Sequence, residues 1–105
     1  MNTIKELKDI LTKWDVVVVD CYAPWCGPCK VLSPIMDELE KEYRGKAAII
    51  KMDVDENEEL ATEFKIRGVP TILFFVKGEL KNKITGLNSK QTISAMIDTA
   101  IEMTK

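Results

Sequence analysis

Residues 16–29 of the 105-residue chain read VVVVDCYAPWCGPC. The run 16–19 is continuously apolar and β-branched, which is typical of a strand buried on both faces of a sheet. Asp20 ends that run, so its carboxylate either is buried for a purpose or points outward at the strand end. Trp25 and a pair of cysteines follow, directly before a helical pattern. The stretch therefore predicts a buried strand that delivers two thiols to the start of a helix.

Cys26 and Cys29 are separated by Gly27 and Pro28, a spacing that can close a small disulfide ring. The unpaired N–H groups at a helix start favour a thiolate on the first cysteine. The second cysteine lies one turn into the helix, where we expect it to be more buried and less ionised. Pro28 is tolerated there because its missing N–H would have no helical partner in any case. The spacing thus predicts an exposed attacking thiol, Cys26, and a covered resolving thiol, Cys29.

The chain offers little for competing kinds of site. It contains no histidine, which excludes Ser-His-Asp and Cys-His catalytic pairs and imidazole metal ligands. A zinc half-site needs about four Cys or His ligands, and only Cys21 could add to the pair, so we expect no metal. Strand alternation puts Cys21 on the face opposite Asp20, where we expect a buried hydrophobe and not a third redox thiol. The acidic residues within 53–59 lack the spacing of a calcium loop, and we expect them to form a solvated helix cap.

Outward from this stretch, helical and strand patterns alternate along the chain. We predict a helix over 4–13, a long helix carrying 31–43, a short helix carrying 60–64 and a last helix after Ser89, with further strands over 47–52, 71–76 and 80–85. Two parallel crossovers and then a hairpin at Lys77-Gly78 imply a mixed central sheet with helices on both faces. We predict a three-layer α/β fold in a single domain, residues 1–105.

Composition and charge exclude several classes of partner. The chain is 46% apolar and 30% charged with a formal net charge of −2, which gives no net attraction to nucleic acid or to anionic membranes. No apolar run reaches the roughly 18 residues that a membrane span needs. The N-terminus lacks the pattern of a signal peptide. We therefore expect a cytoplasmic protein, monomeric, with no nucleic-acid or membrane partner.

Four separated motifs in this sequence resemble the thioredoxin family. They are Trp25-Cys-Gly-Pro-Cys29 shortly after Val18-Val-Asp20, then Pro34, then Val69-Pro-Thr71, and finally Lys77-Gly-Glu79. The match runs in register from about Val16 to the C-terminus. The resemblance implies a thioredoxin fold with four helices and a mixed sheet of four strands. Because only 15 residues precede Val16, we expect the family's first edge strand to be absent or reduced to a few residues around Asn2.

The resemblance also implies roles for individual residues. Asp20 would be the family's buried carboxylate, which accepts the Cys29 proton, and Lys51 would face it. The Val69–Pro70 bond would be cis, although the residues alone favour trans. A flat apolar substrate face is implied at Trp25, Gly27, Pro28, Val69, Pro70, Gly86 and Leu87. Cys21 is a departure, because the family commonly has an aromatic residue at that position.

The implied function is protein-disulfide reduction, with the chain acting as an electron carrier in cell redox homeostasis. Cys26 attacks a substrate disulfide, Cys29 resolves the mixed disulfide, and the pair ends as a Cys26–Cys29 disulfide. The chain has no glycine-rich phosphate loop, so we expect no cofactor, and a separate thioredoxin reductase would restore the dithiol. Two alternatives remain: a disulfide oxidant or isomerase of an exported compartment, and a non-catalytic protein that docks through its apolar face.

Overall fold

The computed structural model describes residues 3–105, and these form four helices and four strands. In chain order the elements are α1 (Ile4–Lys13), β1 (Val16–Tyr22), α2 (Gly27–Glu42), β2 (Ala48–Asp53), α3 (Glu58–Glu63), β3 (Thr71–Val76), β4 (Glu79–Thr85) and α4 (Lys90–Glu102). The order predicted from the periodicity is confirmed. No helix within residues 3–105 has the length and apolar character needed to cross a bilayer.

The four strands form one mixed sheet in the order β2-β1-β3-β4. β1 pairs in parallel with β2 and antiparallel with β3, and β3 pairs antiparallel with β4. β1 is therefore an interior strand with a partner on each side, as its uninterrupted valines predicted. The strand expected around Asn2 lies outside the described residues.

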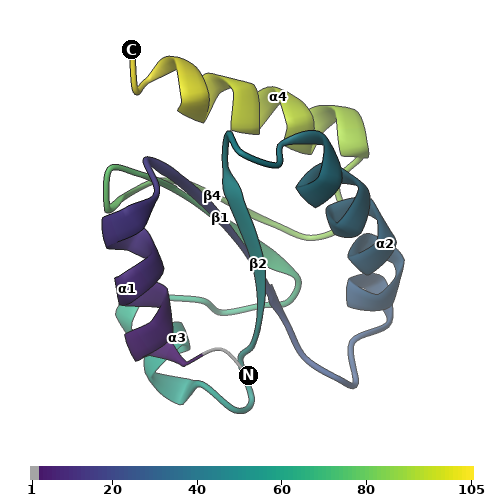
Figure 1. Cartoon of the computed structure of the whole chain (residues 1–105). Helices are drawn as coiled ribbons and strands as arrows, with labels where there is room; N and C mark the ends of the chain where they lie inside the picture. The colour runs from purple at the N-terminus through teal and green to yellow at the C-terminus, as the bar shows by residue number, and fades with distance from the viewer. Residues whose placement is uncertain (1–2) are drawn as a thin grey trace.

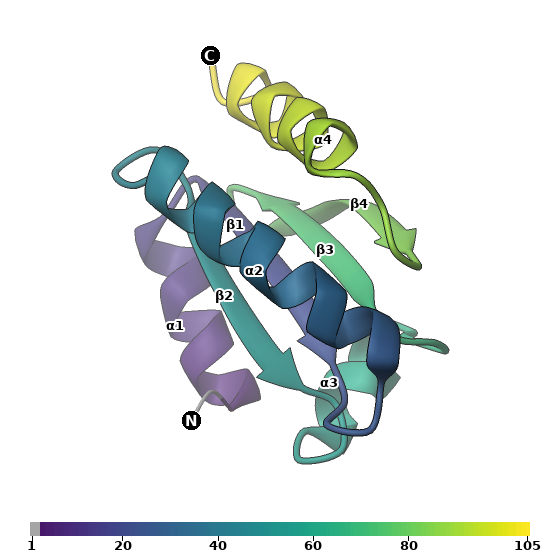
Figure 2. The same ribbon diagram turned by 90° about the vertical axis from the view of Figure 1, so that its right-hand side faces the viewer.

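Helices cover both faces of the sheet, which confirms the three-layer prediction. Figures 1 and 2 show α2 and α4 on one side of the sheet and α1 and α3 on the other. Alternate residues of β1 supply the two cores: Val16 and Val18 pack with α2 and α4, whereas Val17 and Val19 pack with α1 and α3. The period of two along a strand thus assigns each valine to one layer.

Local capping explains where several helices begin. Thr3 and Glu6 form the predicted reciprocal capping box at α1, and the Ser89 side chain accepts the Thr92 N–H at the start of α4. The expected solvated acidic cap of α3 is confirmed in part: Glu58 and Glu59 lie exposed in its first turn, whereas its N-cap residue, Asn57, makes no side-chain capping bond. Asp53 is buried and not solvated, and its carboxylate accepts the Asp55 N–H and holds the turn before α3.

Candidate redox site

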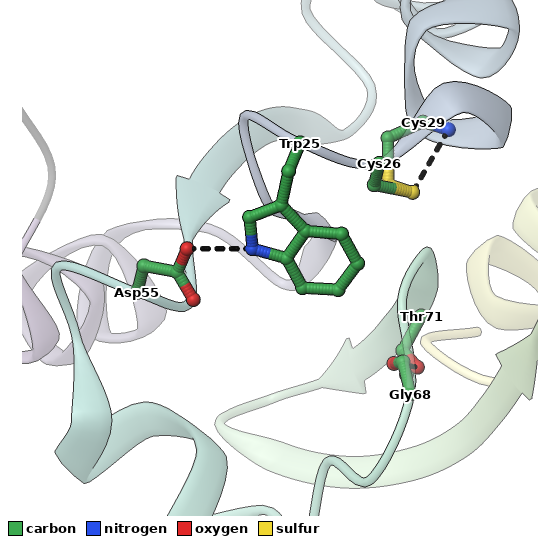
Figure 3. Close-up of a disulfide and its surroundings, with 6 residues drawn as sticks. All are labelled: Trp25, Cys26, Cys29, Asp55, Gly68 and Thr71. Atoms are coloured by element: carbon green, nitrogen blue, oxygen red, sulfur yellow. Dashed lines mark hydrogen bonds between the residues drawn. A yellow bond between two sulfur atoms is a disulfide. The ribbon is translucent and has the colours of Figure 1, made fainter.

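The two closely spaced cysteines lie where β1 leads into α2. Cys26 is the N-cap residue of α2, and its Sγ accepts the Cys29 backbone N–H at 3.2 Å (Figure 3). The two residues are joined by a disulfide, with their Cα atoms 5.3 Å apart. Pro28 occupies the first turn, where a missing N–H leaves no carbonyl unpaired. One sulfur therefore serves both as helix cap and as half of the redox pair.

The expected contrast in exposure between the two cysteines is wrong for this disulfide-bonded form. Cys26 is 3% exposed and Cys29 is 4% exposed. The pair packs with the buried Ala23 and against the partly buried Tyr22 and Val69, so both residues lie beneath the surface. The sequence pattern places Cys26 at an open helix end, but it carries no information on how these neighbours close over the bonded sulfurs.

Asp20 is buried beneath the disulfide. Its side chain is 1% exposed, and its Oδ1 has no hydrogen-bond partner among the described residues. It lines a cavity of about 320 Å³ together with Cys29, Lys30 and Ser33. Burial raises the pKa of the Asp20 carboxyl from 3.8 to about 6, against the opposing charge of Lys51 and with added repulsion from Asp37. The structure thus places an acid that titrates near neutrality in the same cavity as one sulfur of the pair.

Lys51 lies across from Asp20 on the neighbouring strand. The two residues are register partners in the parallel β1–β2 ladder, and both line the same cavity. The Lys51 Nζ donates to Ser33 Oγ at 2.6 Å and to Asp37 Oδ1 at 2.7 Å. These bonds to α2 hold the Lys51 ammonium group near Asp20, where its charge offsets part of the rise in the Asp20 pKa.

The segment before β3 approaches the disulfide from the other side. The Val69–Pro70 peptide bond is cis. Thr71 Oγ1 donates to the Gly68 carbonyl at 2.6 Å, and the Gly86 N–H donates to the Pro70 carbonyl at 2.8 Å. Gly86 has a φ of +93°, which glycine adopts without strain. The bond from Gly86 joins the end of β4 to the cis-proline segment, whose Val69 packs against the cysteine pair.

The residues expected to form a substrate face differ in exposure. Trp25 is 71% exposed and Leu87 is 51% exposed. Gly27 and Pro28 are also exposed, Val69 and Gly86 are half-buried, and Pro70 is buried. Trp25, Pro28 and Leu87 are therefore accessible to a partner, whereas Pro70 is buried.

The sequence does not predict that Asp55 contacts Trp25. The Trp25 indole N–H points to the Asp55 carboxylate and donates to Oδ2 at 2.9 Å (Figure 3). The sequence pattern places Asp55 in the cap of α3 instead. The two residues are 30 positions apart, and no local pattern in the sequence pairs them.

Cys21 is separated from this chemistry by the sheet. It is fully buried in the core formed with α1 and α3, on the face opposite Asp20. Burial raises the pKa of its thiol far above the ordinary range, so it stays protonated. Within residues 3–105, no group of three or more Cys, Asp or Glu side chains is placed to hold a metal ion.

Together these features suit thiol–disulfide exchange with a polypeptide. The disulfide lies at a helix N-terminus, which stabilises a thiolate. A buried carboxyl in the adjoining cavity can hold or release a proton near neutral pH. Exposed apolar side chains such as Trp25 flank the cysteines, and Val69 packs against the pair, where its backbone can hydrogen-bond to an extended chain.

Comparisons with known proteins agree with this geometry. A family model described as Thioredoxin matches residues 2–99. The chain is 50% identical over 82 residues to "Thioredoxin M-type, chloroplastic" of Spinacia oleracea, covering 78% of this chain and 45% of the relative. It is 44% identical over 94 residues to "Thioredoxin" of Rickettsia felis, covering 90% of each protein. It spans 60% of the M-type protein of Pisum sativum, so about half the length of these chloroplast relatives.

Solved structures show the same likeness. The chain superposes on a mutant thioredoxin from Halobacterium salinarum with a TM-score of 0.87 and 39% identity, over 92% of this chain and 84% of the other. It superposes on oxidized mitochondrial thioredoxin 3 from Saccharomyces cerevisiae with a TM-score of 0.86 and 31% identity, over 94% and 92% of the two chains. Both values lie well within the range of a shared fold.

Proposed function

The chain belongs to the thioredoxin family, and on that premise we propose that it reduces disulfide bonds in other proteins. The observation that carries the proposal is the position of the Cys26–Cys29 disulfide at the start of α2, in contact with the cavity that holds Asp20. An inert structural disulfide would need neither a nearby buried acid nor an exposed apolar rim. Both features support exchange of this disulfide with a bound partner.

In the first step the Cys26 thiolate attacks one sulfur of a substrate disulfide. A Cys26–substrate S–S bond forms, the substrate S–S bond breaks, and the second substrate sulfur leaves as a thiolate. The N–H groups at the start of α2 stabilise the attacking thiolate, and the Cys29 N–H already points at that sulfur. The Val69 backbone, beside the cysteine pair, provides the groups to which an extended substrate hydrogen-bonds.

In the second step Cys29 resolves the mixed disulfide. Asp20 takes the Cys29 proton through the shared cavity, and the resulting thiolate attacks Cys26. The Cys26–Cys29 bond forms, the substrate sulfur bound to Cys26 leaves, and two electrons have passed to the substrate. A carboxyl with a pKa of about 6 is suited to this role, because it is mostly ionised at neutral pH and still basic enough to accept a proton.

Restoring the dithiol requires a partner, for which we propose thioredoxin reductase. We propose the cytoplasm as the compartment, because its thiol pool is kept reduced. The chloroplast relatives make a plastid the other candidate. We further propose that residues 1–105 act as one domain and as a monomer on disulfide-containing proteins.

The test is insulin reduction with dithiothreitol as electron donor. We expect the unmodified protein to accelerate insulin precipitation and Cys26→Ser to lose at least about 1,000-fold of the activity, because no other thiol is positioned to attack. Cys21→Ala is the matched control, since it also removes one thiol, and we expect it to keep the activity. Full activity in Cys26→Ser would overturn the mechanism.

Two further measurements separate the remaining alternatives. Equilibration with glutathione gives the redox potential, and a value at the oxidising end would favour an oxidant or isomerase. A Cys26→Ser, Cys29→Ser double variant that supports full function in cells would favour a non-catalytic docking protein. We expect a reducing potential and no function in the double variant.

A further inference from the structure

Three cations line a groove beside the cis-proline segment. Lys65, Arg67 and Lys83 surround a cavity of about 300 Å³ whose other lining residues are Ile66, Gly68, Thr71 and Thr85. All three cations are exposed, and no acidic side chain lines the cavity. Within residues 3–105, none of the three forms an ion pair, whereas Lys8, Arg44 and Lys90 each do. We call this feature the cationic groove.

The cationic groove is held in shape by backbone contacts. Lys83 Nζ donates to the carbonyl oxygens of Phe64 and Lys65 at 3.3 and 3.2 Å, which ties β4 to the segment after α3. Lys65 has a φ of 54° in the left-handed region. The acidic residue nearest to Lys65 in the sequence, Glu63, forms an ion pair with Lys8, with 3.2 Å between Lys8 Nζ and Glu63 Oε1. Three positive charges therefore converge without a neutralising carboxylate between them.

The cationic groove is continuous with the proposed substrate face. Arg67 and Gly68 line both the groove and a smaller cavity of about 140 Å³ that reaches Trp25 and Val69. Thr85, on the far wall of the groove, directly precedes Gly86. A polypeptide lying along Val69 therefore has the groove within reach on one side of the disulfide.

The other side of Trp25 carries the opposite charge. Asp55, Glu56, Glu58 and Glu59 are exposed there, and Asp55 accepts the Trp25 indole N–H. The whole chain has a formal net charge of −2, so the cationic groove is a local reversal of sign. An acidic segment of a substrate is repelled at one rim and attracted at the other, which selects one orientation of that segment.

We propose that the cationic groove binds acidic side chains that flank the disulfide of a polypeptide substrate, and so makes this protein prefer acid-flanked disulfides. The proposal rests on the proposed reductase function. Arg67 offers a planar fork that pairs with a carboxylate through two N–H donors, and the two lysines add charge around it. Charges at such a rim act mainly on encounter rate and orientation, and salt screens them.

Peptides with a chromogenic leaving group test the proposal. Each peptide carries one cysteine joined by a disulfide to thionitrobenzoate. The Cys26 thiolate of pre-reduced protein attacks the peptide sulfur, the S–S bond breaks, and the coloured thionitrobenzoate anion leaves. Cys29 then displaces the peptide thiolate and closes the Cys26–Cys29 disulfide. Two acidic peptides place a pair of glutamates either before or after the cysteine, and glutamine replaces glutamate in the neutral peptides.

We expect one of the two acidic placements to react about fivefold faster than its neutral counterpart at low salt. The advantage should disappear near 1 M salt, where the screening length is about 3 Å. Arg67→Gln should reduce the ratio of acidic to neutral rates about twofold to threefold. The triple variant Lys65→Gln, Arg67→Gln, Lys83→Gln should bring that ratio to about one.

A matched triple variant controls for net charge. The variant Lys13→Gln, Lys46→Gln, Lys77→Gln also removes three positive charges, but none of them lines the groove. Lys77 has a left-handed φ of 50°, which matches the backbone conformation of Lys65. We expect this control to keep the preference. Equal ratios in the two triple variants would overturn the proposal, as would the absence of any preference in the unmodified protein. Failure to release thionitrobenzoate from the neutral peptides would instead contradict the reductase function itself.

Discussion

The two ends of α2 differ in what surrounds them. At the C-terminal end, the buried Tyr43 hydroxyl donates to Asp98 at 2.6 Å and lies 2.6 Å from the Ser94 hydroxyl. Lys90 of α4 also pairs with Glu38 at 2.9 Å and with Glu42. At the N-terminal end, α2 is capped by a reactive sulfur and lies above Asp20, a buried carboxyl with one oxygen unpartnered among the described residues.

This difference separates the part of the helix that holds the fold from the part that reacts. Burial disfavours the ionised Asp20 carboxylate and raises its pKa to about 6, so this end of the helix is where stability is given up. The contacts with α4 fix the far end of α2, so that the end with Cys26 keeps its position while its bonding changes. We can test the comparison by removing the unfavourable group at one end or the anchors at the other.

The largest effect on stability is expected from Asp20→Asn. Folded protein holds the Asp20 proton up to a pKa of about 6, whereas the unfolded chain releases it near 3.8. Between these values the folded state binds more protons, so stability falls as the pH rises through that window. A difference of about two pKa units corresponds to about 3 kcal/mol above pH 6. We therefore expect the variant to be more stable than the unmodified protein at pH 7 by up to about 3 kcal/mol.

Urea unfolding of both oxidised proteins at pH 4 and pH 8 measures this effect. The stability difference between them should be small at pH 4 and large at pH 8. The variant should also resolve mixed disulfides about tenfold more slowly, because an amide cannot accept the Cys29 proton. A stability difference that does not change between pH 4 and pH 8 would contradict the conclusion that burial of the ionised Asp20 carboxylate destabilises the folded protein.

A smaller effect of opposite sign is expected at the anchored end. Tyr43→Phe removes the hydroxyl that joins α2 to Ser94 and Asp98 of α4. We expect a loss of about 1–2 kcal/mol in the free energy of unfolding, since Asp98 is exposed and regains water. Insulin reduction should be unchanged. A loss of activity as large as the loss of stability would show that the two ends of α2 are not independent.

The smallest effect is expected from Lys90→Gln. The Lys90 side chain is partly exposed and pairs with two exposed carboxylates, and surface ion pairs contribute little to stability. We expect a loss below that of Tyr43→Phe, measurable at low salt and absent at high salt. Thermal unfolding at two salt concentrations checks this result, and a salt-independent loss would mean that Lys90 acts through packing.

Local sequence patterns predicted the elements well because their signals span only a few residues. The capping box at α1 needs Thr3 and Glu6, three positions apart. Thr71 follows a proline and precedes five apolar residues, and the strand predicted over 71–76 has those same bounds in the structure. Alternation along β1 placed Asp20 and Cys21 on opposite faces, as the two core layers show.

The features that local patterns did not predict depend on contacts between residues far apart in the sequence. Trp25 pairs with Asp55 across 30 residues, and Tyr43 pairs with Asp98 across 55, so no short pattern encodes either bond. Cys26 is buried in a cluster that includes Val54 and Val69, which belong to distant segments of the chain. The cis bond before Pro70 came from the family resemblance, because the residues alone favour the trans form.

The sulfur that caps α2 also gives the site a built-in reporter. The Cys29 amide donates to Cys26 Sγ, so any covalent change at that sulfur alters the electron density that this one N–H senses. Reduction, alkylation or capture of a substrate would each shift the Cys29 amide resonance in an ¹⁵N-labelled sample. The backbone at this single position can therefore be followed as a spectroscopic record of each stage of turnover, with no probe added to the protein.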